Sequence, residues 1–338
     1  MKTFDVRAWV VWLGCGALLA IYLRNPIYLV LLLLIARVVM MLCKSSEKSV
    51  LQLPFWRMAI LILLFSTIFN VLMAHFGETV LISLPENLYL IGGPLTLEAA
   101  VYGLINGLSL VALLALFFTF NAVVPASQLT TLVPAALHEL GLVLVIAITY
   151  IPETIRHFHR IRDAQAIRGH RLQGLRDWRP IMIPLLVGGL ERAMNLAETM
   201  VARGYGGVSP LSAPHRVRAL AAAGLVCIFV GALRLGWQSV DGWFLLLFGG
   251  GFIVVAYQEL SKSARRTHYR TIKWSWRESI VVLSACIPLL LLSGILPGMD
   301  RSAVAYSPYP LFSVPPFELW VGASLLGLLA PGVLFIWS

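Results

Sequence analysis

Two arginine-glycine pairs are the residues of this 338-residue chain best suited to bind a partner protein. Arg168-Gly169 closes the segment that begins at Ala164, and Arg203-Gly204 follows about 35 residues later, after Met200. A guanidinium stays charged and presents five N–H donors in a rigid fork, which fits an acidic or carbonyl-lined groove. Small alanines beside both pairs permit close approach. The pairs therefore suggest two fixed, charged contact points.

The same pairs have a second interpretation as ordinary helix stops. Arginine in the last turn of a helix complements the helix dipole, and a glycine just past the end adopts the left-handed cap conformation. One such pair alone would favour this interpretation. Because two pairs end two long amphipathic segments in the same basic region, a role in docking gains weight.

Other chemistry has little support in the sequence. The pattern G-x-x-x-x-G-K-[ST] is absent, so the chain has no P-loop with which to hydrolyse ATP. The four cysteines are scattered without a C-x-x-C spacing, which is typical of small apolar fillers. His157, His159 and His170 are close in sequence, but the arginines around them would repel a cation. We expect no catalytic residue, no cofactor site and no metal site.

Glu153 is an acidic residue in an otherwise apolar and basic stretch. It could serve as a proton-relay carboxylate, or it could pair with Arg156 three residues later on the same helix. The spacing favours the ion pair.

The elements that position these residues belong to a polytopic membrane protein. Hydrophobic residues make up 59% of the chain and charged residues 12%, with a mean hydropathy of +0.84. Several windows reach the roughly 17 to 25 apolar residues that a spanning helix needs. The net charge is +10, and the lysines and arginines that produce it lie mostly between these windows. This distribution indicates membrane topology rather than nucleic-acid binding. About eight spans are predicted: 9–23, 27–43, 55–76, 98–123, 218–235, 242–258, 279–297 and 317–336.

Basic loops determine the predicted topology. Lysines and arginines between residues 44 and 57 and between residues 262 and 277 place both loops in the cytoplasm. The loop Gly77–Leu97 then lies outside, and its glycine, proline and β-branched residues predict a short hairpin there. If the apolar stretch 139–156 crossed the membrane, the arginines between residues 156 and 179 would lie outside, against the charge rule. If neither 139–156 nor 180–201 crosses, every basic loop lies inside. We expect a cytoplasmic or interfacial helical domain.

The pattern of residues 184–204 supports this assignment. Apolar residues recur at helical spacing, while glutamates, arginines and an asparagine occupy the other faces. A spanning helix rarely holds so many polar groups. Asp177 is the predicted N-cap of this helix.

Several motifs in this region are also those of a known family. The sequence resembles the transmembrane T component of energy-coupling factor (ECF) transporters, the vitamin and metal-ion uptake branch of ATP-binding cassette systems. The resemblance covers roughly residues 27–235. It is carried by Ala164-Gln165-x-x-Arg168-Gly169, by Glu191-Arg192-Ala193, by Leu196-Ala197-Glu198, by Ala202-Arg203-Gly204-Tyr205, and by Gly92–Glu98 followed by Tyr102-Gly103-Leu104.

The resemblance implies a role for each motif. In that family two Ala-Arg-Gly motifs end crossed coupling helices, and each motif docks on one of two ATPase subunits. ATP and magnesium would be bound by those subunits, and an S component in the membrane would bind the substrate. One departure is that Ile167 stands where the family usually has alanine, which concerns packing around Arg168 more than its charge. Carried over by position, the ATPase-coupling residues are Ala166, Arg168, Gly169, Ala202, Arg203 and Gly204, and the S-component contacts are Leu186, Leu190, Met194 and Ala197.

A second departure is length, because the family's core ends near residue 235 and this chain continues to Ser338. The added helices are expected to pack on the core, with a fused accessory or substrate-recognition role as the alternative. The chain is thus divided into N-terminal transmembrane helices (1–124), a coupling domain (125–216) and C-terminal transmembrane helices (217–338).

The resulting hypothesis is a non-catalytic T subunit of an ATP-driven importer of vitamins or metal ions. It would lie in a bacterial or archaeal cell (inner) membrane with both termini in the cytoplasm. Two alternatives from other classes are a polytopic enzyme acting on lipid or isoprenoid substrates and a membrane scaffold without transport. The mostly basic cytoplasmic domain, without acidic clusters for magnesium, disfavours the enzyme.

Overall fold

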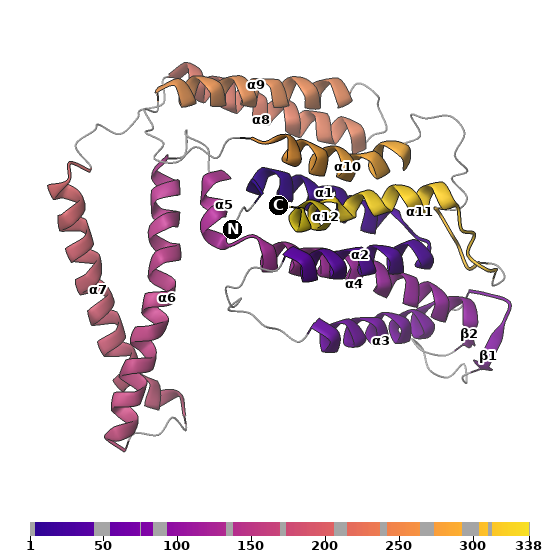
Figure 1. Ribbon diagram of the computed structural model, residues 1–338, viewed down its shortest axis with the longest axis horizontal. Coiled ribbons are helices and arrows are strands. Elements are labelled where there is room, and N and C mark those ends of the chain that lie inside the picture. Colours follow the sequence, from indigo (N-terminus) through magenta and orange to yellow (C-terminus); the bar gives the residue numbers. More distant parts are fainter. Residues whose placement is uncertain are drawn as a thin grey trace. The chain divides into compact units, whose positions relative to one another are not determined.

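The computed structural model describes residues 4–43, 55–74, 76–83, 93–132, 138–169, 174–205, 215–236, 242–263, 274–292, 304–309 and 313–337. These residues are almost entirely helical (Figure 1). The helices are α1 (Val6–Tyr22), α2 (Pro26–Cys43), α3 (Phe55–Met73), α4 (Leu97–Val123), α5 (Ala126–Leu129), α6 (His138–Ile167), α7 (Arg179–Ala202), α8 (His215–Gly236), α9 (Gly242–Ser263), α10 (Trp276–Leu292), α11 (Leu319–Leu325) and α12 (Ala330–Ile336). Short 3₁₀ turns are η1 (Thr130–Leu132), η3 (Leu175–Trp178) and η5 (Leu326–Leu329), and the strands are β1 (Val80–Ser83) and β2 (Pro94–Thr96).

The predicted all-α polytopic fold is confirmed. Six helical stretches are long and apolar enough to cross a membrane, and α1 and residues 244–259 of α9 are shorter apolar helices. One of the six, Gly141–Ile167 in α6, lies in the segment that the charge rule keeps out of the membrane, and it is the least apolar of them. Its interfacial placement stays a prediction that rests on the arginines of its C-terminal half. The six stretches are Pro26–Cys43, Phe55–Met73, Leu97–Val123, Gly141–Ile167, His215–Arg234 and Leu319–Ile336.

The chain divides into two compact units that do not follow sequence order. One unit contains residues 1–129 and 271–338, and the other contains residues 130–270. The predicted segment 217–338 is therefore divided: α8 and α9 belong to the second unit, and α10, α11 and α12 belong to the first.

The first unit has its core on α1, α2 and α4. Tyr28, Leu29 and Leu32 on α2 are fully buried, as is Leu116 on α4. Helix α3 packs on α4 at a glycine: a Cβ on Gly103 would lie 2.8 Å from the Ser66 carbonyl oxygen. The Ser66 hydroxyl donates to the Gly103 carbonyl at 2.8 Å. Such close backbone approach through small residues is common between membrane helices.

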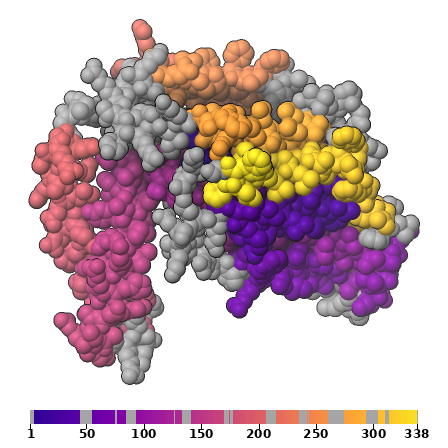
Figure 2. Space-filling view, viewed as in Figure 1, coloured from indigo at the N-terminus to yellow at the C-terminus, as the bar shows by residue number. Residues whose placement is uncertain are grey.

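Of the added C-terminal helices, α10, α11 and α12 pack on the N-terminal helices (Figures 1 and 2), and α9 packs on α8, the last helix of the predicted core. The Trp12 indole N–H donates to the Leu328 carbonyl at 2.9 Å, at the 3₁₀ turn η5 that interrupts the predicted span 317–336. The Asn25 amide donates to the Pro316 carbonyl at 2.7 Å. The expectation that these helices pack on the core is therefore confirmed.

The predicted hairpin between α3 and α4 is present as β1 and β2, which pair antiparallel with Val80 opposite Thr96. The fully buried Glu98 carboxylate accepts from the Thr79 hydroxyl at 2.5 Å and from the Thr79 backbone N–H at 3.2 Å. These bonds tie the start of β1 to the first turn of α4.

The second unit contains two helix pairs, α6 with α7 and α8 with α9. In the second pair the backbones approach closely, because a Cβ on Gly224 would lie 3.0 Å from the Gly249 carbonyl oxygen. The first pair carries both arginine-glycine motifs.

Candidate functional site

Helix α6 ends in a left-handed glycine turn at the first motif. The helix runs without interruption from His138 through Pro152 to Ile167, and Arg168 and Gly169 form the turn that follows. Gly169 has φ of +80°, and its N–H donates to the Ala166 carbonyl at 3.0 Å. An L side chain rarely adopts this conformation, which explains why glycine is used here.

Helix α7 ends in the same way at the second motif. Gly204 has φ of +82°, and its N–H donates to the Val201 carbonyl at 2.9 Å. The Tyr205 N–H donates to the Met200 carbonyl at 2.9 Å, which completes a Schellman motif. The helix-stop interpretation of both pairs is thus confirmed. It is compatible with docking, because a stop fixes the backbone that carries each arginine.

The N-terminal end of α7 differs from the prediction. Trp178 occupies the N-cap position without a side-chain cap, and Pro180 lies in the first turn. The Asp177 carboxylate instead accepts from the Gly174 N–H at 2.9 Å within the preceding turn. Proline has no N–H that needs a cap and has a suitable φ, so the helix starts there without Asp177.

Helices α6 and α7 form an antiparallel pair, here called the α6–α7 hairpin (Figure 1). The Gln165 amide donates to the Pro180 carbonyl at 3.4 Å near the connection between the helices, and the Tyr150 hydroxyl donates to the Arg192 carbonyl at 3.4 Å further away. The C-terminal end of α6 lies beside the N-terminal end of α7 at the connection, and the two helices diverge toward their other ends (Figure 1). The 24 residues of α7 span about 36 Å, so the two arginine-glycine turns lie at opposite ends of the hairpin.

All six predicted coupling residues are exposed within this chain. Ile167, which stands where the family usually has alanine, is 89% exposed. Its side chain, larger than that of alanine, therefore displaces no neighbouring residue of this chain. Neither Arg168 nor Arg203 makes a side-chain hydrogen bond or ion pair with any residue that the structure describes. Both guanidiniums are therefore available to a partner. The six are Ala166, Arg168, Gly169, Ala202, Arg203 and Gly204.

The predicted S-component contacts form one exposed stripe along α7. Leu186, Leu190 and Met194 are 65%, 63% and 52% exposed, and Ala197 on the same face is also exposed. Positions that repeat every three or four residues share one face of a helix. Large apolar side chains gathered on one face in this way indicate a surface that another molecule covers.

The charged groups along α6 are partly paired. The Arg156 guanidinium lies 2.6 Å from the Glu153 carboxylate, which confirms the ion pair that the spacing predicts. Because both side chains are largely exposed, this pair contributes little to stability. His157 packs against α7, where its Nε2 would lie 2.9 Å from a Cβ on Gly188. Among the described residues no group of three metal-ligating side chains comes together, and His170 lies outside them.

The sequence did not show two features of this site. Tyr205 closes the second turn through its backbone N–H, which has no side-chain signature. The hairpin register, with Tyr150 beside Arg192, depends on contacts between helices about 40 residues apart. Gly188 on α7 was the one available signal for this register, because a glycine leaves room for the His157 ring of the neighbouring helix.

Comparison with known proteins gives the same family as the motifs. The family model CbiQ, described as a cobalt transport protein, matches residues 1–214. The energy-coupling factor transporter transmembrane protein EcfT of Lactococcus lactis subsp. cremoris is 28% identical over 161 residues, which cover 46% of this chain and 40% of the relative. The protein of the same name from Acidaminococcus fermentans is 32% identical over 165 residues, covering 42% of this chain and 61% of the relative.

A third relative is more similar over a shorter stretch. The EcfT protein of Streptococcus thermophilus is 40% identical over 81 residues, which cover 22% of this chain and 30% of the relative. The chain thus matches less than two thirds of the length of each of these curated relatives. Because the family model covers more than half of its residues, the chain belongs to the CbiQ family of cobalt transport proteins.

Proposed function

We propose that this chain is the non-catalytic transmembrane T subunit of an ATP-driven ECF importer for a vitamin or a metal ion. The observation that carries the proposal is the pair of left-handed glycine turns, at φ of +80° and +82°, at opposite ends of the α6–α7 hairpin. Each turn holds one exposed arginine on a fixed backbone. Such an arrangement suits two like partners at two separate points.

Two ATPase subunits are the proposed partners of the turns. They would bind the ATP and magnesium, since this chain has no P-loop. Arg168 and Arg203 would each place a planar, charged fork against acidic or carbonyl groups of one ATPase. Ala166, Ala202 and the two glycines keep the surface beside each arginine small.

A membrane-embedded S component is the proposed partner of the apolar stripe on α7. Leu186, Leu190, Met194 and Ala197 would contact it, and it would select the cargo. The proposed complex lies in a bacterial or archaeal cell membrane, with both termini of this chain in the cytoplasm.

The hairpin would transmit movement from the ATPases to the S component. Closure of the ATPase pair on ATP would shift the two turns, and a stiff helix carries a displacement at its end along its length. The stripe on α7 would then tilt and move the S component between two orientations.

A double variant, Arg168→Ala with Arg203→Ala, tests this proposal. We expect it to lose the ATPases on purification from native membranes and to lose uptake, while its yield and melting temperature in detergent stay near the wild type. Each single variant should retain part of the ATPase recovery and part of the uptake. Arg160→Ala is the matched control, because it removes an exposed arginine of α6 away from the turn.

The same purification distinguishes the alternatives. Undiminished ATPase recovery and uptake by the double variant would show that the turns do not couple this chain to ATPases. Recovery of neither an ATPase nor a small hydrophobic subunit with the wild type would favour a scaffold, and a modified lipid product would favour an enzyme.

A further inference from the structure

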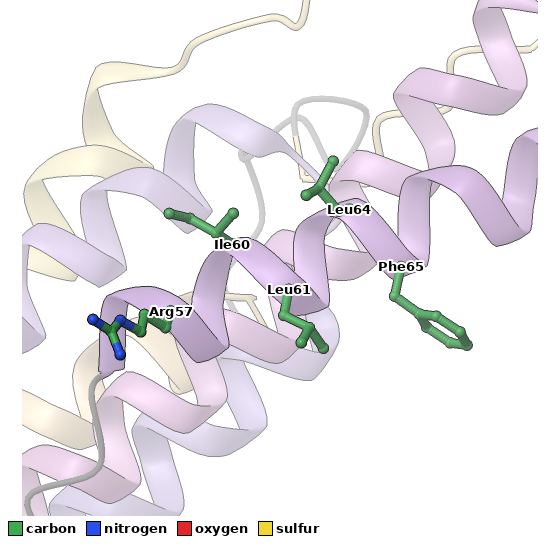
Figure 3. A pocket seen from close by; sticks show the side chains of 5 residues that line it. All are labelled: Arg57, Ile60, Leu61, Leu64 and Phe65. Atoms are coloured by element: carbon green, nitrogen blue, oxygen red, sulfur yellow. The ribbon is translucent and has the colours of Figure 1, made fainter.

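The groove on α3 is a lipid-facing surface without a specific ligand. It is shallow, has a volume of about 590 Å³ and is almost wholly apolar (Figure 3). Hydrocarbon chains cover such a surface as well as apolar side chains do. Its lining residues are Arg57, Ile60, Leu61, Leu64 and Phe65. Reactive side chains meet elsewhere in the first unit, between α1 and α10.

Two cysteines that are far apart in the sequence lie in contact at this junction. The sulfur atoms of Cys15 on α1 and Cys286 on α10 are 3.7 Å apart, although 271 residues separate the two positions. Cys15 is 7% exposed, and Cys286 is the more exposed of the two. This pair, here called the Cys15–Cys286 pair, has no C-x-x-C spacing that could reveal it in the sequence.

A hydrogen bond near the start of both helices holds α1 and α10 in register. The Asp5 backbone N–H donates to the Glu278 carboxylate at 3.0 Å, and this carboxylate also accepts from the Ser275 N–H at the start of α10. Glu278 is only 5% exposed. Because both helices begin at this contact and run parallel from it, their cysteines come level about ten residues further on.

Helix α10 lacks one backbone hydrogen bond beside Cys286. Pro288 lies inside the helix and has no N–H to donate to the Ser284 carbonyl. The Ser284 carbonyl oxygen instead faces η5, where a Cβ on Gly327 would lie 2.7 Å from it. Bonded sulfurs are about 2 Å apart, so the pair has roughly 1.7 Å to close. The turn of α10 that carries Cys286 is the place where that adjustment costs least.

We propose that Cys15 and Cys286 form a reversible disulfide, which links the N-terminal helix to the added C-terminal helices. The predicted spans 9–23 and 279–297 place both thiols inside the membrane. The oxidant must therefore dissolve in hydrocarbon, and the class that fits is an organic hydroperoxide, ROOH. The proposal does not depend on the transport function.

The oxidation has two steps. In the first, the O–O bond of ROOH breaks, its terminal oxygen bonds to the Cys286 sulfur, and the alcohol ROH leaves, so that Cys286 becomes a sulfenic acid. In the second, the Cys15 sulfur attacks the Cys286 sulfur, the S–O bond breaks, and water leaves with the Cys15 proton. The two thiols lose two electrons in total, and the hydroperoxide is reduced to an alcohol and water. A thiol reductant reverses the reaction by exchange.

The other two cysteines provide the comparison within the same chain. The buried Cys43 thiol donates to the Pro331 carbonyl at 3.6 Å, and Cys227 lies on α8 in the second unit. Neither has a second sulfur within hydrogen-bond distance among the described residues. The geometry thus selects one pair out of four thiols.

Thiol counting on the full chain in detergent tests the proposal, with cumene hydroperoxide as the oxidant. Oxidised wild type, unfolded and labelled with a maleimide, should show two free thiols instead of four. Peptide mapping should find one cross-linked peptide that contains residues 15 and 286. Because the bond closes a long loop, the melting temperature should rise and return to its starting value on reduction.

Single variants separate the two steps. Cys15→Ala should give no cross-linked peptide and should leave a sulfenic acid on Cys286 that dimedone traps. Cys286→Ala should give neither product. Cys43→Ala is the matched control, because this thiol is also buried, at 3% exposed, and it should keep the cross-link and the rise in melting temperature.

Three results would overturn the proposal. The first is four free thiols in wild type after treatment with the hydroperoxide. The second is a cross-link that involves Cys43 or Cys227, or that joins two copies of the chain. The third is an equal rise in melting temperature in wild type and Cys15→Ala, which would assign the stabilisation to another oxidised residue. The first two use the wild-type chain, so they hold even if a variant folds poorly.

Discussion

Helices α2 and α7 both carry an apolar stripe, but they use it differently. On α2, Leu29 and Leu32 are fully buried against other helices of the same unit. On α7, Leu186 and Leu190 are more than 60% exposed, and Ile181 is the one buried residue of that helix. One stripe therefore stabilises the chain itself, and the other leaves its apolar surface for another molecule to cover.

The polar contacts of the two regions differ in the same way. In the first unit, the Trp12 and Asn25 side chains bond at 2.9 and 2.7 Å to backbone carbonyls about 300 residues away. In the α6–α7 hairpin the bonds from Tyr150 and Gln165 are 3.4 Å long. The first unit is thus joined by side-chain bonds to distant segments of the chain, whereas the bonds between α6 and α7 are few and longer.

The largest expected effect is in the first unit, at Gly103→Leu. A Cβ there would overlap the Ser66 carbonyl oxygen and the Thr67 Cα, at 2.8 and 2.9 Å, so backbone must shift. We expect a loss of about 3 kcal/mol in the free energy of unfolding, with poor extraction and a much lower melting temperature. Gly14→Leu, where nothing lies within 4 Å, is the control. Equal melting temperatures for the two variants would contradict the close α3–α4 contact.

A smaller effect is expected for Trp12→Phe. The variant loses the N–H that reaches the Leu328 carbonyl and leaves a buried polar group without that donor, at a cost of about 2 kcal/mol. Trp9→Phe is matched in size and burial, and its indole makes no hydrogen bond among the described residues. In thermal unfolding in detergent, Trp12→Phe should have a lower melting temperature than Trp9→Phe. The reverse order would indicate that packing, not this bond, attaches the C-terminal helices.

The smallest effect on stability is expected for Leu190→Glu in the hairpin. Because this side chain is 63% exposed, the free energy of unfolding of the isolated chain should stay within about 0.5 kcal/mol of the wild type. Co-purification of a small hydrophobic subunit should nevertheless be lost. Asn195→Glu places the same charge on the opposite face of α7 and should leave that subunit bound. Loss of stability in Leu190→Glu alone would show that the stripe is covered by this chain itself.

The local features of the site were predictable because they depend on neighbouring residues. Helical periodicity predicted α7, and a glycine directly after an arginine predicted where both helices end. The cap at Asp177 was wrong because Pro180 offered a competing helix start that needs no side-chain cap. The 3₁₀ turn η5 was missed, and its contact with Trp12, which lies more than 300 residues away, has no signature near residue 328.

The amino-acid sequence by itself determined the class of this protein, most of its helices, the β1–β2 hairpin and the two arginine-glycine turns. These follow from hydropathy, periodicity and the backbone freedom of glycine, which act over a few residues. The tertiary structure alone decided that α10–α12 join α1 and α2, and that the two turns lie at opposite ends of one antiparallel pair. Both depend on which distant surfaces fit together, and no short-range pattern in the chain encodes that fit.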